Sequence, residues 1–367
     1  MREALVQISG WQKARLKLPS WAEIPDITYS EKLSLEQCSS ETTAHYKLEI
    51  ARRICQDHHE QLADLTGGLA VDGSTLARHF QHFTYVEQQE ALCHIALHNL
   101  PLLGINNFEV CQGRCEDILP TLPLQDLIFM DPARRDDAGR KVVGLNDCTP
   151  DVTMMLEALK DKCNHLMLKL SPMIDIKSAA KQLGGVQEVH VVAVDGECKE
   201  VLMVKDFQKT ADNNIRTFAI NIRGNGYRET FDFLADEEQN ATSLLANSIE
   251  AYLYEPNAAV MKAGGFKLLT HLHPVRQLDA NTHLYTSSQW VENFPGRKFK
   301  VADTTSFSKK ALKAFLSGMK QANLTVRNFP ATVAELRKRL NLKEGGEDYV
   351  FATSMGTERL LVRCKKI

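Results

Sequence analysis

Short apolar runs alternate with stretches of helical spacing between residues 59 and 206 of the chain. The apolar runs lie at residues 83–87, 108–111, 127–130 and 165–170. The run at 127–130 is apolar at every position, which is typical of a central strand covered on both faces of a parallel sheet. Strands that alternate with helices in this way predict an α/β fold with a doubly wound sheet.

An antiparallel hairpin completes this pattern. Residues 188–194 and 197–204 are rich in apolar residues, and Asp195-Gly196 between them is a strong signal for a tight turn. Residues 62–65 supply a further short strand at the start. We therefore expect a Rossmann-like, doubly wound sheet of seven strands.

Helical segments precede this sheet. Ser39, Ser40 and Glu41 have the composition of a helix start, with two N-cap candidates and an acid in the first turn. Apolar residues follow at helical spacing, and Lys47 lies off that apolar stripe. We expect a helix that leads from this start into the first strand.

The C-terminal third predicts further α+β structure. Residues 252–286 have the order of a small α/β unit, and residues 231–240 carry the acids of a solvated link. From Phe299 onward the expected order is strand, helix (309–321), strand, helix (332–340) and two strands.

Four domains are expected from this organisation. They are an N-terminal helical segment (1–58), the doubly wound domain (59–206), a small ferredoxin-like α+β domain (207–290) and a basic domain (291–367). The basic domain has 16 Lys and Arg against 7 Asp and Glu, a net charge of +9, which leaves 28 against 39, a net charge of −11, in the other residues. This asymmetry suggests an anionic polymer partner such as nucleic acid. The alternative is a solvated helix face.

Composition narrows the class of protein. The chain has 367 residues, of which 44% are hydrophobic and 25% charged, as in ordinary globular proteins. It has no apolar run of about 18 residues that would span a membrane, and residues 1–19 lack an apolar signal region. We expect a cytoplasmic protein with no membrane partner. The nine cysteines include no CxxC pair, and His271 and His273 have no third ligand nearby in sequence, so we expect reduced thiols, packing histidines and no metal.

Candidate chemistry centres on residues 64–72, Asp-Leu-Thr-Gly-Gly-Leu-Ala-Val-Asp. The end of a buried strand, the pair Gly67-Gly68 and a helical stretch follow one another, a geometry that lets the backbone approach a nucleotide-like ligand closely. Glu87 ends the next expected strand about 20 residues later, where a carboxylate accepts hydrogen bonds from both ribose hydroxyls. The alternative for Glu87 is a surface acid at a strand end.

Polar residues follow several of the expected strands. Asp64, Glu87, residues 113–117, Asp131 and Ser171 all stand at such positions. Ligands of doubly wound sheets bind at the carboxyl ends of the strands. One nucleotide-sized ligand could therefore touch all of these residues.

Three segments of this region resemble a class I S-adenosylmethionine-dependent methyltransferase, and most closely the RNA guanine-N2 methyltransferases of the trimethylguanosine-synthase type. Residues 39–44 look like that family's Thr-Pro-Glu-x-x-Ala helix start, and residues 64–72 look like its glycine-rich motif. Asp131-Pro132 looks like its catalytic Asp/Asn/Ser-Pro-Pro segment. The resemblance covers residues 36–205 and implies S-adenosylmethionine as the cofactor.

The resemblance also assigns cofactor contacts. Asp64, Gly67 and Gly68 would line the methionine and sulfonium end, and Glu87 would hold the ribose. The cofactor-binding residues that we expect are Asp64, Gly67, Gly68, Asp72, Glu87 and Asp117.

The adenine contact departs from the family pattern. The family often has Gly-Asp at the turn where this chain has Gly113-Arg114. Glu116 or Asp117 must then supply the contact, and we prefer Asp117.

The acceptor segment resembles the family in part. In amino methyltransferases the acid and the following carbonyl hold the exocyclic amine, and an aromatic side chain after the prolines stacks on the base. Asp131 and Pro132 fit this pattern, whereas Ala133 replaces the second proline and Arg134 replaces the aromatic residue. Because a guanidinium plane can stack on a base or bind a phosphate, the resemblance implies Asp131, Pro132 and Arg134 as catalytic residues. The alternative is that Asp131 caps a helix and Arg134 pairs with the acids at 136–137.

The function expected is methyl transfer to a base nitrogen of structured RNA, either tRNA or rRNA. The C-terminal region loosely resembles the THUMP-type RNA-binding folds of tRNA-modifying methyltransferases, and basic residues lie on both of its expected helices. No cysteine adjoins Asp131 in sequence, which argues against a covalent thiolate mechanism at uridine C5, unless Cys148 lies near it in space. The alternatives are methylation of a protein or small molecule, and an inactive methyltransferase-like RNA-binding protein.

Overall fold

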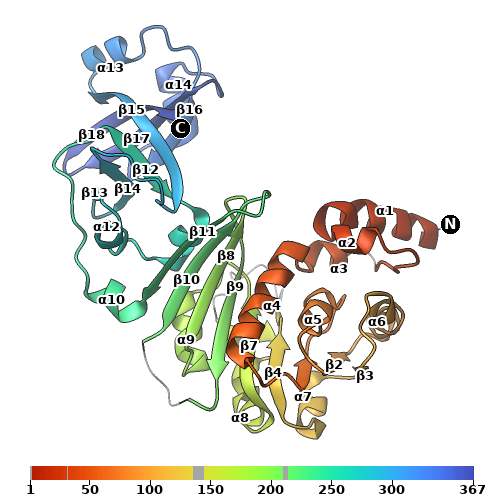
Figure 1. Cartoon of the computed structure of the whole chain (residues 1–367). Helices are drawn as coiled ribbons and strands as arrows, with labels where there is room; N and C mark the ends of the chain where they lie inside the picture. Colours follow the sequence, from red (N-terminus) through yellow and green to blue (C-terminus); the bar gives the residue numbers. More distant parts are fainter. Residues whose placement is uncertain (1, 31, 135–143, 210–213) are drawn as a thin grey trace. The chain divides into compact units, whose positions relative to one another are not determined.

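The computed structural model describes residues 2–30, 32–134, 144–209 and 214–367 (Figure 1). These residues form two compact units. The first unit comprises Met1–Val192 and Lys199–Ile215, and the second comprises Ala193–Cys198 and Arg216–Ile367.

The first unit contains the expected doubly wound sheet. Its strands lie in the order β8-β9-β7-β4-β1-β2-β3. Neighbours from β7 to β3 run parallel, whereas β9 is antiparallel to β7, so the doubly wound α/β sheet predicted from the sequence is confirmed. The expected number of seven strands is wrong, because this sheet has nine strands among the described residues. The strands are β1 (Gln61–Asp64), β2 (His82–Glu87), β3 (Phe108–Gln112), β4 (Gln125–Met130), β7 (Cys163–Leu170), β8 (Glu188–Val194) and β9 (Glu197–Asp206).

Helices connect and cover these strands (Figure 1). The helices of the first unit are α1 (Arg2–Lys17), α2 (Pro19–Ala22), α3 (Lys32–Gln37), α4 (Glu41–Cys55), α5 (Val71–Leu76), α6 (Glu90–Leu102), α7 (Cys115–Ile118), α8 (Val152–Lys162) and α9 (Ile176–Leu183). Short 3₁₀ helices lie at Leu119–Thr121 and Leu145–Asp147, and a two-stranded ladder joins β5 (Ala133–Arg134) to β6 (Cys148–Thr149).

The start of α4 follows the capping pattern in the sequence. Ser40 is the N-cap residue, and its hydroxyl accepts a hydrogen bond from the Thr43 backbone N–H. Ser39 points elsewhere and donates to the carboxylate of Asp72. Lys47 is fully buried, which its place off the apolar stripe did not predict.

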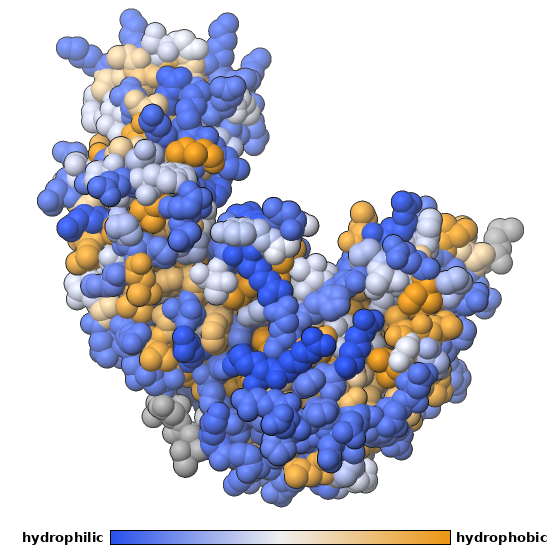
Figure 2. Space-filling model, viewed as in Figure 1, coloured by the Kyte–Doolittle hydropathy of each residue, from blue (hydrophilic) through white to orange (hydrophobic). Residues whose placement is uncertain are grey.

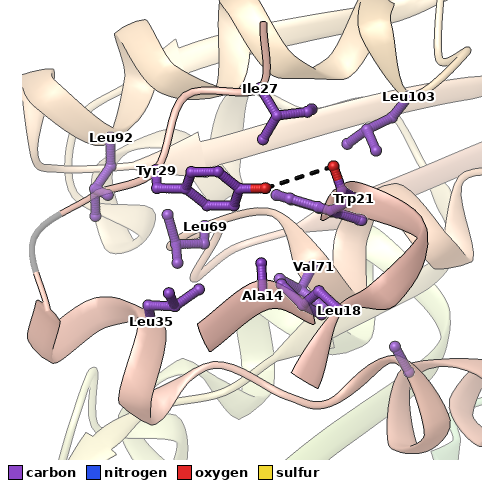
Figure 3. Packing of buried hydrophobic residues seen from close by; sticks show 11 residues of the cluster. Ala14, Leu18, Trp21, Ile27, Tyr29, Leu35, Leu69, Val71, Leu92 and Leu103 are labelled. Atoms are coloured by element: carbon purple, nitrogen blue, oxygen red, sulfur yellow. Dashed lines mark hydrogen bonds between the residues drawn. The ribbon is translucent and has the colours of Figure 1, made fainter. Parts of the chain in front are cut away.

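A hydrophobic cluster attaches the N-terminal helices to the segment around α5 (Figure 3). Leu18 and Trp21 pack with Leu69 and Val71, which flank the start of α5. The Tyr29 hydroxyl lies among them and donates to the Trp21 carbonyl oxygen over 3.5 Å. Residues 69–71 directly follow the glycine pair, so the N-terminal helices support the glycine turn from behind.

The surface is mostly polar on the face shown in Figure 2, with hydrophobic residues in small groups. Large apolar side chains are exposed on α1 at Leu5, Ile8, Trp11 and Leu16. None of the described helices combines the length and the apolar character that a membrane crossing requires.

The second unit begins with an antiparallel pair, β10 (Arg216–Ile222) and β11 (Arg228–Leu234), followed by α10 (Ala235–Asn240). Phe231 and Phe233 are buried in β11. The expectation of a solvated link over residues 231–240 is therefore wrong for its first half, because the two phenylalanines alternate onto one buried face of a strand.

A seven-stranded sheet forms the rest of the second unit, in the order β13-β14-β12-β15-β18-β17-β16. Its strands are β12 (Tyr252–Pro256), β13 (Arg276–Asp279), β14 (Thr282–Ser287), β15 (Gly296–Ser306), β16 (Asn323–Arg327), β17 (Asp348–Met355) and β18 (Glu358–Lys366). Its helices are α11 (Ala258–Ala263), α12 (Leu269–Leu272), α13 (Lys309–Phe315) and α14 (Val333–Leu340), so the helix expected at 309–321 ends earlier.

A hydrophobic cluster joins strands from both parts of this sheet. Leu253 and Leu284, from β12 and β14, pack in the same cluster as Phe299, Phe351 and Val362, from β15, β17 and β18. The backbone of β12 is also paired with that of β15. The segments before and after residue 295 are thus halves of one folded sheet.

The two histidines considered for a metal site lie in the second unit. His271 contacts the Thr242 carbonyl oxygen at 2.8 Å through Nε2. The His273 ring packs against Phe231 and Phe294. Both therefore have packing or hydrogen-bonding partners of their own.

Candidate active site

A cavity of about 810 Å³ lies in the first unit at the carboxyl ends of β1, β2, β4 and β7. This volume is within the range of about 300–1,000 Å³ that is typical of small-molecule sites. Parallel strands place their carboxyl ends at one edge, which explains why residues far apart in sequence meet here. Of the residues expected in the site, the lining includes Asp64, Gly67, Gly68, Asp72, Glu87, Asp131 and Pro132.

The two glycines are required for different reasons. A Cβ atom on Gly67 would lie 2.2 Å from the Tyr85 ring, so a side chain there would collide with β2. Gly68 has room around it but a φ of +52°, which favours glycine. The Gly67 N–H donates to the Val86 carbonyl oxygen, and the Tyr85 hydroxyl donates to the Gly68 carbonyl oxygen over 2.6 Å. The turn is thus bound to β2 on both sides.

Glu87 ends β2 and is oriented by the backbone. Its Oε2 accepts a hydrogen bond from the Gly68 N–H at 3.0 Å, and its Oε1 accepts one from the Gln89 N–H at 2.9 Å. The residue is only half-buried and lines the cavity. Carboxylate oxygens have further lone pairs, so Glu87 can accept ligand hydroxyls in a fixed geometry.

Asp64 is a buried acid in a negative environment. It is 1% exposed, and its Oδ1 accepts hydrogen bonds from the Thr66 N–H and hydroxyl. Burial raises the pKa of Asp64 to about 8, and the nearby carboxylates of Asp72, Asp131 and Glu87 add to the rise. A cationic ligand group in the cavity would relieve this accumulation of negative charge.

Asp131 follows β4 and is fixed at both backbone and side chain. Its N–H donates to the Thr66 hydroxyl at 2.6 Å, which ties the segment after β4 to the glycine turn. Its Oδ2 accepts a hydrogen bond from Lys169 Nζ at 2.5 Å. The Asp131 side chain remains 37% exposed, whereas that of Lys169 is 11% exposed.

Behind this pair lies a buried ionic network. Lys47 Nζ is 3.1 Å from a carboxylate oxygen of Asp72 and 2.6 Å from one of Glu200. Lys169 Nζ is 3.7 Å from Asp72, whose Oδ2 also accepts a hydrogen bond from the Ser39 hydroxyl at 2.6 Å. Asp72 therefore serves the network, and its expected contact with a cofactor stays a prediction.

The network sets the charge of its members. Burial by itself would raise the pKa of Asp72, but Lys47, Lys169 and the Ser39 hydrogen bond outweigh it and hold the pKa below its ordinary value. Burial would likewise lower the pKa of Lys169, but Asp131, Asp72 and Glu200 outweigh it and raise the pKa. Lys169 is thus a fixed cation, and Asp72 is a fixed anion.

The turn after β3 gives Glu116, not Asp117, a place in the cavity wall. Glu116 lines the cavity and its carboxylate lies 3.1 Å from Arg114 Nη2. Asp117 is exposed and is absent from the lining among the described residues. Of the two acids left open by the sequence, Glu116 is the better placed for an adenine contact.

The other two residues expected in the catalytic segment, Pro132 and Arg134, follow Asp131 in the chain. Pro132 is buried and lines the cavity. Arg134 lies in β5 opposite Cys148 of β6, but its side chain and the acids at 136–137 are outside the described part of the chain. Cys148 lines the same cavity as Asp131, so the exception that the sequence analysis left open for this thiol remains.

Lys47, Lys169 and Glu200 were missed by the sequence analysis. A signal for Lys169 existed, since it interrupts the apolar run Leu166-Met167-Leu168-Lys169-Leu170 of a central strand. A charge in such a strand requires a buried partner. The partners of Lys169 could not be predicted from the sequence, because Asp131 and Asp72 are distant from it along the chain.

Two family models match the C-terminal part of the chain. Residues 252–295 match a ferredoxin-like domain, and residues 296–366 match a THUMP domain-like family. No curated protein matches the chain.

Solved structures resemble the chain over different lengths. The "putative methyltransferase" of Porphyromonas gingivalis W83 is 34% identical with a TM-score of 0.90, and the match covers 99% of this chain and 90% of that chain. A class I S-adenosylmethionine-dependent methyltransferase-like structure from Listeria monocytogenes is 9% identical over 53% of this chain and 68% of that one, with a TM-score of 0.39. An rRNA methylase from Streptococcus thermophilus is 14% identical with a TM-score of 0.34, and the match covers 44% of this chain and 95% of that chain. The chain belongs to the same family as the Porphyromonas gingivalis protein, a methyltransferase-like family in which an α/β fold is followed by ferredoxin-like and THUMP-like domains.

Proposed function

We propose that this protein is an S-adenosylmethionine-dependent methyltransferase that acts on structured RNA, either tRNA or rRNA. One observation supports this most directly. A single cavity is lined by the glycine turn and Glu87 on one side and by Asp131-Pro132 on the other. Because Asp131 is hydrogen-bonded to Thr66 of the turn, a donor held by the glycines would lie next to the acceptor segment.

The residues present fit the cofactor. Its sulfonium and ammonium groups are cationic, which suits Asp64 and the carboxylates around it. Glu87 would accept the ribose hydroxyls, and Glu116, or Asp117 as expected from the sequence, would contact the adenine. Bound there, the cofactor supplies an activated methyl group. The protein's own part is to align the acceptor and exclude water.

RNA is proposed as the substrate because of the second unit. It contains the THUMP domain-like segment, and Lys309, Lys310 and Lys313 are exposed on α13. Within the described chain these three lysines form no ion pair with an acid. Unpaired surface cations of this kind are suited to phosphate contacts.

Two finer points of the sequence analysis stay predictions. The likeness to trimethylguanosine-synthase-type enzymes implied a base nitrogen as the acceptor, with Asp131, Pro132 and Arg134 in the catalytic segment. The motifs that carry that likeness do not contain Lys169, whose positive charge lies next to the Asp131 carboxylate. The division of the chain into domains at residues 58, 206 and 290 also stays a prediction.

The test is label transfer from a methyl-labelled cofactor to RNA from a strain that lacks the gene. Asp131→Asn should lower transfer by about 10²-fold or more, because the carboxylate charge is lost while the shape is kept. Cofactor binding, measured by calorimetry, should be retained. Loss of cofactor binding in this variant would instead give Asp131 a structural role.

The same assay separates the alternatives. Label that appears in protein rather than RNA supports a protein methyltransferase of the same fold. RNA binding without any label supports an inactive methyltransferase-like protein.

A further inference from the structure

The acceptor side of the cavity presents a cation and a carboxylate side by side. Lys169 Nζ lies 2.5 Å from Asp131 Oδ2, and both residues line the cavity. Oδ1 of Asp131 makes no hydrogen bond to any residue that the structure describes. An acceptor group that reaches Asp131 would therefore meet a free carboxylate oxygen and a nearby ammonium group together.

The positive charge of Lys169 is held in place from behind. Asp72 lies 3.7 Å from Nζ, and Lys47 and Ser39 in turn fix Asp72. If the Lys169 ammonium moved away from its carboxylate partners, almost fully buried charges would lose their counter-ions, which is costly. Lys169 is thus a permanent feature of the site and no proton acceptor.

A fixed cation discriminates between acceptor atoms. An amine nitrogen becomes positively charged as it attacks a methyl group, so a neighbouring ammonium raises its barrier. A hydroxyl must lose its proton, and its oxygen becomes negatively charged as it attacks. The same ammonium stabilises that oxygen, and the adjacent carboxylate can take the proton.

On the basis of the proposed RNA methyltransferase function, we infer that the acceptor is a hydroxyl group rather than a base nitrogen, with Asp131 as its base and Lys169 as the cation that faces its oxygen. Within an unmodified RNA chain the free hydroxyl is the ribose 2′-hydroxyl. The product is then a 2′-O-methyl nucleotide.

The reaction balances with the groups present. The O–H bond of the acceptor breaks, and its proton passes to the Asp131 carboxylate and from there to water. The electron pair left on the oxygen forms the O–CH₃ bond. The S–CH₃ bond of the donor breaks with its electron pair on sulfur, which leaves the uncharged thioether as the second product. Lys169 stays protonated throughout.

The position of the label tests the inference with unmodified protein. RNA from a strain that lacks the gene is incubated with the full chain and methyl-labelled cofactor, and is then hydrolysed with alkali. Alkali cannot cleave the phosphodiester next to a 2′-O-methyl ribose, because that cleavage needs a free 2′-oxygen. We expect label in alkali-resistant dinucleotides.

The other outcomes are distinct. Label in mononucleotides would place the methyl group on a base, which overturns the hydroxyl acceptor and keeps the proposed RNA methyltransferase. Absence of label in RNA, despite cofactor binding, would reject the proposed function, and the inference falls with it.

Substitutions at Lys169 test the role of its charge. Lys169→Met should lower the transfer rate by about 10²–10³-fold, as does loss of one charge-stabilising group in other active sites. Lys169→Arg, which keeps the charge, should restore part of that rate. A Lys169→Arg variant as slow as Lys169→Met, with both still able to bind cofactor, would contradict the role of the charge.

A measurement without cofactor completes the test. Nitrogen NMR of the lysine side chains should show Lys169 protonated beyond the ordinary lysine pKa of about 10.4. A Lys169 that deprotonates below that value would not be a fixed cation, and the discrimination against an amine would be lost.

Discussion

Asp64 shows how a single buried side chain responds to the charges of a ligand site. Its carboxyl group is in contact with the cavity, and no cation is among the groups that shift its pKa. The folded protein therefore holds a proton on Asp64 that the unfolded chain releases at lower pH. Stability then falls as the pH rises from the ordinary aspartate value of 3.8 toward the folded value of about 8.

This predicts a pH-dependent gain from Asp64→Asn. At about pH 5 the wild-type group is neutral in the fold but already ionised in the unfolded chain, so the variant should show only a small part of its gain in stability. At about pH 9 the wild-type group is charged in the fold, and the variant should be more stable by several kcal/mol, because each unit of the difference in pKa is worth about 1.4 kcal/mol. Thermal unfolding of the cofactor-free protein at the two pH values measures the difference.

The exposed Asp161 of α8 provides the matched control, since its carboxylate stays in contact with solvent in the folded protein. Asp161→Asn should leave the unfolding temperature unchanged relative to wild type at both pH values. An equal gain for Asp64→Asn at low and high pH would contradict the shifted ionisation.

Single residues also mark the limit of what the sequence predicts. Asp64, Glu87 and Asp131 could be found, because each follows an apolar run and the carboxyl ends of parallel strands share an edge. Lys47 and Lys169 could not be placed, because a lysine is read as solvent-facing until its partner is known. Glu200, the ion-pair partner of Lys47, lies on β9, far along the chain.

At the level of elements, the glycine turn and β2 form one unit. The Gly67-Gly68 pair predicted a turn, but the sequence did not show that Gly67 is required by the Tyr85 ring. Strand positions were predictable, since apolar runs bounded by turns are local signals. The buried face of β11 was missed, because the acids beside Phe231 and Phe233 obscured the alternation.

Gly67→Ala and Gly68→Ala should therefore destabilise the protein for different reasons. Gly67→Ala should destabilise the protein by about 1–3 kcal/mol through overpacking against Tyr85, and should weaken cofactor binding. Gly68→Ala should cost about 1–2 kcal/mol through its positive φ alone. Denaturant unfolding measures both.

Tyr85→Leu distinguishes the two causes. It should relieve Gly67→Ala, so that the double variant is more stable than the sum of the single effects by about 0.5–3 kcal/mol. It should not relieve Gly68→Ala. Additive effects for Gly67→Ala and Tyr85→Leu would mean that the ring does not set the requirement for glycine.

At the level of the whole molecule, charge is divided between the acidic body and the basic end of the chain. A triple variant of α13, Lys309→Gln, Lys310→Gln and Lys313→Gln, should weaken RNA binding. The slope of log affinity against log salt should fall by about 0.7–0.9 for each phosphate that the variant no longer neutralises. Fluorescence anisotropy across a salt series measures the slope, and calorimetry should show unchanged cofactor affinity.

Lys160, Lys177 and Lys181 are exposed lysines of the first unit and provide a control with the same change in charge. Their replacement by Gln should alter RNA affinity much less. Equal losses in the two triple variants would mean that RNA responds to net charge and not to α13.

The shared interior of the second unit restricts how this protein could be recombined. Leu253 and Leu284 on one side of residue 295 are covered by Phe299, Phe351 and Val362 on the other. A hybrid protein that received residues 296–366 alone would expose Phe299, Phe351 and Val362. The protein from which they were removed would expose Leu253 and Leu284. The ferredoxin-like and THUMP-like segments would therefore have to be transferred together to keep this interior closed.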